Sequence, residues 1–386
     1  MSPPPLHAML EGLIAAPSVS SVNPRWDQGN LGVIELLDVW LGDLGFSTQI
    51  QAIPNHPGKF NLVASRGSGP EGLVLSGHSD TVPFDDNRWS SDPFRLTERD
   101  QRLHGLGTAD MKGFFALVIE ALRELPLRQI KRPLTIIATA DEESSMCGAQ
   151  ALAGLGTRLG RHVVIGEPTG LKPIRSHKGI AMEAIRLGGR SGHSSDPSLG
   201  NSALEGMHLV IGELLQWRGE LQRRYRNPLF AVEVPTLNLG HIHGGDNPNR
   251  ICGHCELHID LRPLPGISLD ELRGELEGRL KTLIEPTGLE LEIKRLFTGV
   301  PAMETPAEAA IVRATEELTG HAAGAVAFAT EGPYFNDMGM EAVILGPGSI
   351  DQAHQPDEYL ALEQIQPAIG LIRELAWRFC LSENEG

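Results

Sequence analysis

Short apolar segments and amphipathic segments alternate along roughly the first 180 residues of the chain. Apolar residues at helical spacing predict helices, and short apolar runs bounded by Gly, Pro or acidic residues predict buried strands. In chain order the pattern predicts a helix at 30–44, a strand at 46–53, a hairpin of strands at 60–65 and 72–77, a helix at 114–125, and strands at 134–140 and 162–165. This alternation favours an α/β domain, in which ligands bind at the ends of strands.

The pattern changes near residue 182, where apolar and polar residues alternate within the strands. Such alternation indicates a sheet with one face packed on helices and one polar face open. The segments predicted there are a strand at 182–187, a helix at 201–215, strands at 232–243 and 255–261, a helix at 268–283 and a strand at 289–296. The order β-α-β-β-α-β is typical of a ferredoxin-like domain. We therefore predict an α/β domain from residues 1–181 and 297–386, with an α+β domain of residues 182–296 inserted in it.

Composition narrows the classes of partner. The chain has 33 basic and 49 acidic residues and a net charge of -16, which opposes binding to nucleic acid or anionic lipid. No apolar run approaches the roughly 20 residues of a membrane-spanning helix, and Met1 is followed by Ser2 and three prolines instead of a signal sequence. Four cysteines in this length fit a reducing compartment. We expect a cytoplasmic protein with no nucleic-acid or membrane partner.

Candidate chemistry begins where the strand at 72–77 ends, at His78 and Asp80. Residues two apart on an extended chain point to the same side, as a metal ligand and its orienting carboxylate would. A histidine beside an aspartate is more often a structural hydrogen-bonded pair. The metal-site interpretation therefore depends on what the other strand ends carry.

Those other segment ends carry mainly carboxylates. The residues concerned are Asp110 before a helix, Glu142 and Glu143 after the strand at 134–140, Glu167 after the strand at 162–165, and His354 in a polar loop. Adjacent carboxylates repel one another, which marks either a solvated turn or a cation site. Two histidines and four or five carboxylates without a thiolate suit two divalent cations such as zinc, cobalt or manganese. One carboxylate would bridge the two cations, and another would stay off the metals and act as the base. Of the adjacent Glu142 and Glu143, one could be a metal ligand and the other the base.

Five segments in this order resemble the metal-site motifs of the family of two-zinc deacylases and exopeptidases. They are SGHSDTVP, GLGTADMKG, ATADEE, GEPTG and GPGSIDQAHQPDE, and they extend across nearly the whole chain. The resemblance implies a zinc-exopeptidase-like catalytic domain, an inserted lid and dimerisation domain, and a homodimer. It also implies two bound divalent metal ions, Zn²⁺ in the first place and Co²⁺ as the alternative.

The resemblance assigns a role to each motif residue. Asp110 would bridge the two metals, with His78 and Glu167 on one, and Glu143 and His354 on the other. Glu142 would be the general base, and Asp80 would orient His78. His193, in the inserted domain, would stabilise the oxyanion in the active site of the other subunit.

Within the family, SGHSSDP, PTLNLGHIHGGDNPNRIC and HIDLRPLPG look most like the enzymes that hydrolyse N2-acetyl-L-ornithine in arginine biosynthesis. Asn249 and Arg262 match positions that hold the substrate carboxylate, and a guanidinium suits a bidentate carboxylate. Arg250 departs from the usual pattern, which leaves open whether Arg250 or Arg262 has that role. The resemblance does not say what binds the substrate ammonium; Glu331, in a Gly/Pro loop, is our candidate.

Alternatives remain at this point. One is another N-acyl-amino-acid deacylase, such as one that acts on succinyl-diaminopimelate. A metal-free binding relative is a second, although the complete ligand set opposes it. A thiol oxidoreductase is a third, because Cys252 and Cys255 have a C-x-x-C spacing. That motif enters a predicted strand instead of opening a helix, which disfavours a redox role.

Overall fold

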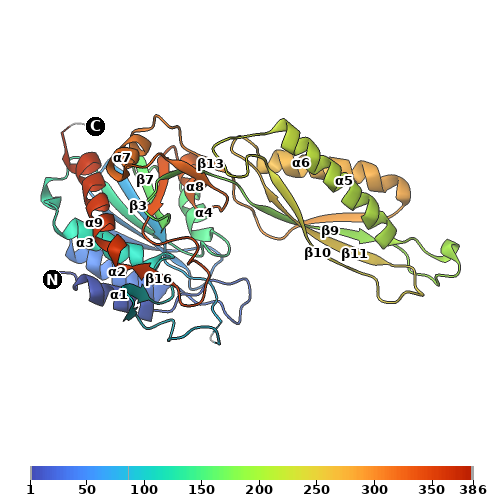
Figure 1. Cartoon of the computed structure of the whole chain (residues 1–386), viewed down its shortest axis with the longest axis horizontal. Helices are drawn as coiled ribbons and strands as arrows, with labels where there is room; N and C mark the ends of the chain where they lie inside the picture. The colour runs from blue at the N-terminus through green and yellow to red at the C-terminus, as the bar shows by residue number, and fades with distance from the viewer. Residues whose placement is uncertain (1, 86, 384–386) are drawn as a thin grey trace. The chain divides into compact units, whose positions relative to one another are not determined.

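The computed structural model describes residues 2–85 and 87–383, which fold into two compact units (Figure 1). The first unit contains the chain up to Arg175, Thr305–Gly324 and the chain from Glu331 onward. The second contains Ser176–Glu304 and the short return Ala325–Thr330. The segment 182–296, predicted to be an inserted domain, lies within this second unit.

The first unit is built on a mixed sheet. Its strands are β1 (Ser47–Ala52), β2 (Phe60–Arg66), β3 (Leu73–His78), β6 (Leu134–Thr139), β7 (His162–Pro168) and β15 (Glu341–Gly346). The same sheet continues with β8 (Ile174–His177), β13 (Met303–Glu304) and β14 (Gly324–Val326), which lie wholly or partly in the segments of the second unit. They are ordered β1-β2-β6-β3-β7-β15-β8-β13, with β14 beside β8. The four strands β6, β3, β7 and β15 are parallel. Every residue of β3, β6 and β7 is buried, as is usual for central parallel strands.

The predicted hairpin of residues 60–65 and 72–77 is wrong. Both segments are strands, but β6 lies between them and pairs antiparallel with β2 and parallel with β3. The Gly/Pro-rich turn between the segments indicated an adjacent pair. The apolar β3 is instead buried between two parallel neighbours, which covers more of its surface than an edge position in a hairpin.

Helices cover both faces of this sheet (Figure 1). One face carries α1 (Leu6–Ala15), α2 (Leu31–Asp43), α3 (Lys112–Arg123), α7 (Ala310–Thr319) and α9 (Leu362–Ala376), which continues as the π-helical η4 (Trp377–Leu381); the 3₁₀ turn η1 (Leu127–Gln129) follows α3. The other face carries α4 (Cys147–Gly154) and α8 (Gly332–Asp337). A small antiparallel sheet of β4 (Thr97–Arg99), β5 (Arg102–His104) and β16 (Tyr359–Ala361) completes the unit. The helix predicted at 30–44 is α2, and the buried helix predicted at 114–125 is α3.

The second unit has the predicted β-α-β-β-α-β order. Its elements are β9 (Ala181–Gly188), η2 (Pro197–Leu199), α5 (Ala203–Arg224), β10 (Thr236–Gly244), β11 (His254–Arg262), α6 (Leu269–Ile284), η3 (Glu285–Thr287) and β12 (Glu290–Arg295). The sheet is antiparallel, in the order β10-β11-β9-β12. The Ser268 hydroxyl accepts from the Glu271 amide, so α6 starts with the N-cap that its sequence suggests.

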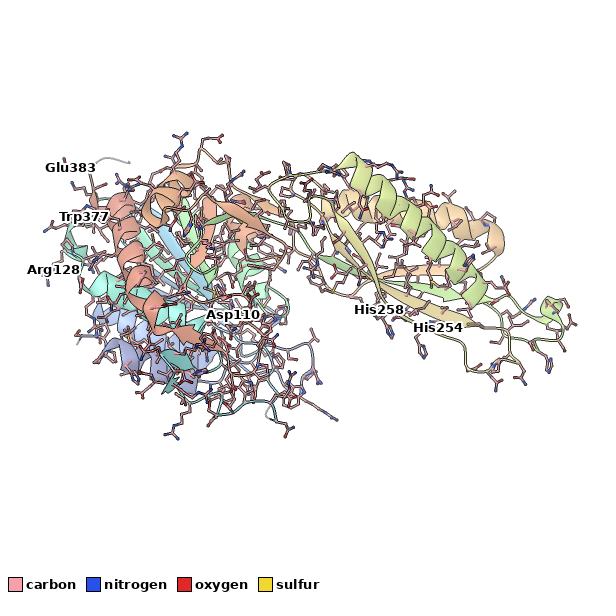
Figure 2. All side chains as sticks on the ribbon, in the orientation of Figure 1. Asp110, Arg128, His254, His258, Trp377 and Glu383 are labelled. Atoms are coloured by element: carbon pink, nitrogen blue, oxygen red, sulfur yellow. The ribbon has the colours of Figure 1, made fainter. Side chains whose placement is uncertain are left out.

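One face of this second sheet is apolar and the other polar. Along β11, Cys255 and Leu257 are buried against the core that α5 and α6 cover, and their neighbours are more exposed. His254 and His258 point away from the two helices (Figure 2). The alternation of buried and more exposed residues along β11 therefore fits a sheet with one face packed on helices, as the sequence predicts. Among residues 2–85 and 87–383, no helix combines the length and apolarity that crossing a membrane requires.

Candidate metal centre

The candidate ligands of the first unit meet at one edge of its sheet. His78 is the last residue of β3, Glu167 lies near the end of β7, and Glu142 and Glu143 follow β6. Parallel strands deliver their carboxyl ends to the same edge, which explains why residues so distant in sequence converge. Asp110 comes from the loop before α3 and is labelled in Figure 2.

Asp110 lies between the two histidines. Its Oδ1 is 3.0 Å from His78 Nε2, and its Oδ2 is 3.6 Å from His354 Nε2. Glu167 Oε1 lies 3.9 Å from His78 Nε2, and Glu143 Oε2 lies 3.0 Å from His354 Nε2. Each imidazole therefore has its own carboxylate partner, with Asp110 shared between them.

Asp80 holds the turn that carries the two glutamates. Its Oδ1 and Oδ2 accept hydrogen bonds from the amides of Glu142 (3.2 Å) and Glu143 (3.1 Å). His78 Nδ1 is 2.9 Å from the backbone carbonyl of Asp80 and 3.7 Å from its carboxylate. The hydrogen bond that orients His78 is therefore made by the main chain of Asp80. The side chain, to which the resemblance gives the orienting role, lies 3.7 Å from His78 Nδ1 and also fixes Glu142 and Glu143.

The cluster is electrostatically crowded. Burial raises the pKa of Glu142 well above its ordinary value, and repulsion from Glu167 raises it further. Burial and repulsion from Asp110 likewise raise the pKa of Glu167. Burial alone would lower the pKa of His78, but its hydrogen bond to Asp110 and the attraction of Glu167 outweigh burial and raise it. A divalent cation between these carboxylates would favour their ionised forms.

The donor set fits divalent cations. Two sets of three residues bring their ligand atoms close together. Within each set, the ligand atoms all lie within 4.8 Å of one another; the sets are His78/Asp110/Glu143 and His78/Glu142/Glu167. They offer imidazole nitrogen and carboxylate oxygen, the donors that borderline and hard divalent cations prefer. A third such group, His56/Asp141/Cys147, is less suited to a cation because the Lys59 ammonium already lies 2.6 Å from Asp141.

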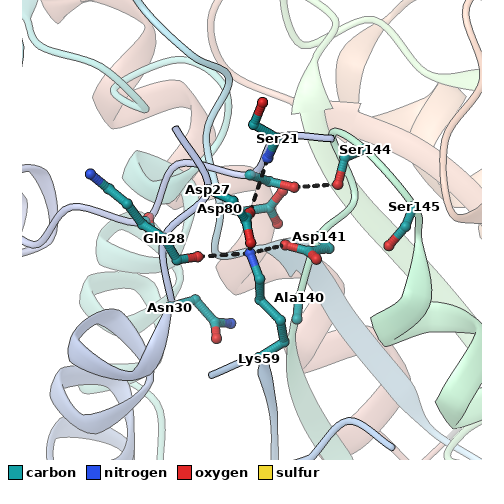
Figure 3. Close-up of polar contacts among 12 residues, drawn as sticks. Ser21, Asp27, Gln28, Asn30, Lys59, Asp80, Ala140, Asp141, Ser144 and Ser145 are labelled. Carbon is teal, nitrogen blue, oxygen red and sulfur yellow. Dashed lines mark hydrogen bonds and ion pairs between the residues drawn. The ribbon is translucent and has the colours of Figure 1, made fainter. Parts of the chain in front are cut away.

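Lys59 is a buried cation beside the site that the sequence did not reveal. Its Nζ lies 2.7 Å from Asp27 Oδ1, 2.6 Å from Asp141 Oδ1 and 2.7 Å from the carbonyl of Gln28 (Figure 3). Asp141 precedes Glu142 and has a left-handed backbone (φ 55°). Its carbonyl accepts from the amides of Ser145 and Met146. Lys59 therefore neutralises the residue on which the turn after β6 is built.

Glu331 is a buried carboxylate near this edge of the sheet. It is 1% exposed, and neither side-chain oxygen has a hydrogen-bond partner with good geometry among the residues described, although the nearby Thr139 hydroxyl favours its ionised form. The hydroxyl of the neighbouring Thr139 donates to the carbonyl of Gly77 (3.2 Å). Burial raises the pKa of Glu331 to about 7. An unpartnered buried carboxylate is costly, which favours a cationic partner from outside the chain.

The other predicted site residues belong to the second unit. His193 is exposed, and its Nδ1 lies 2.7 Å from Ser195 Oγ. Its main chain pairs with that of Arg250, which brings His193 beside the loop of Asn249. Arg262 lies on β11 and makes a two-pronged contact with Asp260, at 2.8 and 3.0 Å. Both Asn249 and Arg250 are exposed, and the Arg250 guanidinium is paired with Asp246 at 2.5 Å.

Comparison with known proteins agrees with this geometry. The sequence model of the peptidase family M20/M25/M40 matches residues 74–378. The chain belongs to this family. It is 50% identical over 377 residues to the acetylornithine deacetylase of Edwardsiella ictaluri (strain 93-146), with 98% of both chains covered. It is 48% identical over 381 residues to that of Photorhabdus laumondii, with 99% of both covered.

A solved structure extends the agreement to the fold. The metallo-carboxypeptidase Sso-CP2 of Sulfolobus solfataricus, of the same family, superposes with a TM-score of 0.74 at 16% identity over 97% of this chain and 98% of its own. The predicted family, the α/β fold with its inserted ferredoxin-like domain and the metal-dependent hydrolase class are thereby confirmed.

The Lys59 pairs generate a prediction about stability. Lys59→Met leaves Asp141 buried without a cation, and loss of one member of a buried pair costs about 3–5 kcal/mol in the free energy of unfolding. Urea denaturation should show this loss, and Lys59→Met/Asp141→Asn should recover most of it because the buried charge of Asp141 is gone and the other partner, Asp27, is partly exposed to solvent. Lys131→Met, which removes an exposed pair with Glu383, is the control and should change little. Equal effects of Lys59→Met and Lys131→Met would contradict the prediction.

Proposed function

We propose that the chain hydrolyses N2-acetyl-L-ornithine to L-ornithine and acetate, a step of arginine biosynthesis. The observation that carries the proposal is the identity of about half of all residues with two acetylornithine deacetylases over nearly the full length of each. The gathered histidines and carboxylates of the first unit support it, because amide hydrolysis in this family is metal-dependent. We further propose a cytoplasmic homodimer.

Two divalent cations would occupy the candidate metal centre. We assign His78 and Glu167 to one, Glu143 and His354 to the other, and Asp110 to both, with Zn²⁺ as the first choice and Co²⁺ as the alternative. The contacts of Asp110 with both histidines support this division. When bound, such cations polarise the amide carbonyl and lower the pKa of water.

Glu142 is the residue we assign as general base. Its amide is held by Asp80, and its side chain shares a group with His78 and Glu167, so the carboxylate lies beside the proposed reaction centre. Glu142 would take a proton from the attacking water and pass it to the leaving amine nitrogen.

The substrate's two other charged groups need partners. We assign Asn249, with Arg262 or Arg250, to the substrate carboxylate, and Glu331 to the ornithine ammonium. Each guanidinium already has an aspartate partner, Asp260 for Arg262 and Asp246 for Arg250, and Arg250 is the more exposed of the two. The unpartnered oxygens of Glu331 support its assignment, since an ammonium would satisfy them.

The rivals gain no support from the structure. Cys252 and Cys255 are both buried, and burial raises the pKa of Cys255, which opposes a reactive thiolate. Another N-acyl-amino-acid deacylase would share the metal centre and differ in the groups that bind the substrate side chain. A substrate panel therefore separates the proposed function from that rival.

The panel compares N2-acetyl-L-ornithine, N-acetylmethionine and succinyl-diaminopimelate with added Zn²⁺ or Co²⁺. Acetylornithine should have the highest kcat/KM in the wild type. Glu331→Gln should raise KM for acetylornithine more than for acetylmethionine, whose side chain is uncharged. A preference for succinyl-diaminopimelate would refute the substrate assignment, and equal effects of Glu331→Gln on both acetyl substrates would refute the role of Glu331.

Substitution of Glu142 separates a base from a ligand. Glu142→Gln should lower kcat by roughly 10²–10⁴-fold, the usual contribution of a general base, while both metal ions remain bound. Metal content by inductively coupled plasma mass spectrometry is the second readout. Loss of one metal in this variant, with retention in Glu143→Gln, would mean that the roles of the two residues are exchanged.

The proposed dimer predicts complementation between subunits. If His193 acts in the partner's active site, homodimers of His193→Ala and of Glu142→Gln should both be nearly inactive. Full exchange between two such C₂ dimers gives about half heterodimers, each with one intact site, and should restore roughly a quarter of wild-type activity. Mass spectrometry verifies the exchange. A mixture that exchanges and stays inactive would place His193 in its own chain's site or outside catalysis.

A further inference from the structure

Glu358 is a buried carboxylate that has no role in the proposed reaction. It is 1% exposed and lies between the loop that carries His354 and strand β16. Its carbonyl accepts from the Gly105 amide (3.1 Å). Its side chain points to the same loop, the loop that carries Asp110.

The Glu358 carboxylate accepts hydrogen bonds from three main-chain amides of that loop. Oε1 accepts from Ala109 (2.8 Å) and Asp110 (3.0 Å), and Gly107 donates to Oε1 and Oε2 at 3.1 and 3.0 Å. Successive amides that point to one anion form a concave anion site, here filled by a side chain of the protein itself. The conformation of residues 107–110 thus depends on Glu358.

The loop has little freedom to adopt this conformation in another way. Gly107 has a left-handed backbone (φ 87°), and a Cβ there would lie 2.7 Å from Lys112 Cε. The buried Lys112 gives its hydrogen bond to the carbonyl of Ala16 (2.9 Å). The Lys112 ammonium therefore does not hydrogen-bond Glu358. The Glu358 carboxylate is bound by the amides of Gly107, Ala109 and Asp110, and it orients them.

Glu358 also ties together two candidate ligands from distant segments. It follows His354 by four residues and bonds the amide of Asp110, whose Oδ2 faces His354 Nε2 at 3.6 Å. We propose that Glu358 is a positioning residue: its carboxylate sets the place of Asp110 relative to His354 and thereby the affinity for the divalent cations that Asp110 would share. The inference rests on the metal assignment of the proposed function.

The test measures metal binding by the full-length protein. Glu358→Gln keeps the shape but removes the charge that the three amides share, and with its oxygen in the place of Oε1 it turns an amide nitrogen toward the Gly107 N–H. Loss of a group that supports a ligand typically weakens metal binding 10–100-fold, and we expect that loss for Zn²⁺ in competition with a chromophoric chelator. The absorption bands of the Co²⁺ form should shift, because the environment of Asp110 changes. With saturating metal, KM for acetylornithine should stay close to the wild-type value while kcat recovers.

Glu363→Gln is the matched control, since Glu363 is an exposed glutamate at the start of α9. It should bind Zn²⁺ like the wild type. A second variant, Gly107→Ala, distorts the same loop with Glu358 intact and should also weaken binding. Circular dichroism establishes that each variant is folded, and Glu358→Asp replaces Glu358→Gln if the latter is unfolded.

Two results would overturn the proposal. One is a folded Glu358 variant whose Zn²⁺ affinity and Co²⁺ spectrum match those of Glu363→Gln. The other is failure of both Glu358 variants to fold, which would make the residue a requirement for folding. A wild-type chain that binds two metal ions without hydrolysing acetylornithine would refute the proposed substrate and leave the role of Glu358 standing.

Discussion

Electrostatic repulsion among buried and partly buried carboxylates is the constraint around which the first unit is organised. Glu142, Glu167 and Asp110 meet at the carboxyl edge of the parallel strands, and the described chain provides only two imidazoles, His78 and His354, in contact with them. The surrounding contacts hold this arrangement in place. Asp80 takes the amides of the glutamate turn, Lys59 neutralises Asp141, and Glu358 holds the Asp110 loop. Divalent cations bound between these carboxylates would replace their mutual repulsion with attraction. The geometry and the charge of the cluster therefore both favour a site for divalent cations.

The sequence predicted those site residues that follow a recognisable local pattern. His78, Glu142 and Glu167 each come at the end of an apolar run, and strand ends of an α/β domain converge in space. His354 lies in a polar loop and not at the end of an apolar run, so its local pattern is weaker and the family motif provides the stronger signal. The second unit was predicted well because alternation within its strands and the Ser268 cap are local signals.

The missed residues act through contacts that have no local pattern. Lys59 meets Asp141, and Glu358 meets Asp110, across long stretches of chain, and nothing in the neighbouring sequence says that either side chain is buried. The hairpin error has a similar origin. A turn-like segment after β2 was taken as evidence of pairing with β3, whereas β6 from much later in the chain lies between them. Pairing of parallel strands is decided by tertiary packing.

The insertion of β15 between β7 and β8 has a consequence for the order of assembly during synthesis. Strand β15 and the segment of His354 and Glu358 leave the ribosome after the whole of Ser176–Glu304. The acidic cluster of β3, β6 and β7 is therefore complete in sequence long before the residues that close the sheet beside it exist. Contacts between such distant segments form slowly, because closing a long loop costs entropy before any contact compensates. The sheet of the first unit can be completed only when its C-terminal segment arrives, and a metal centre that includes His354 could be assembled only then.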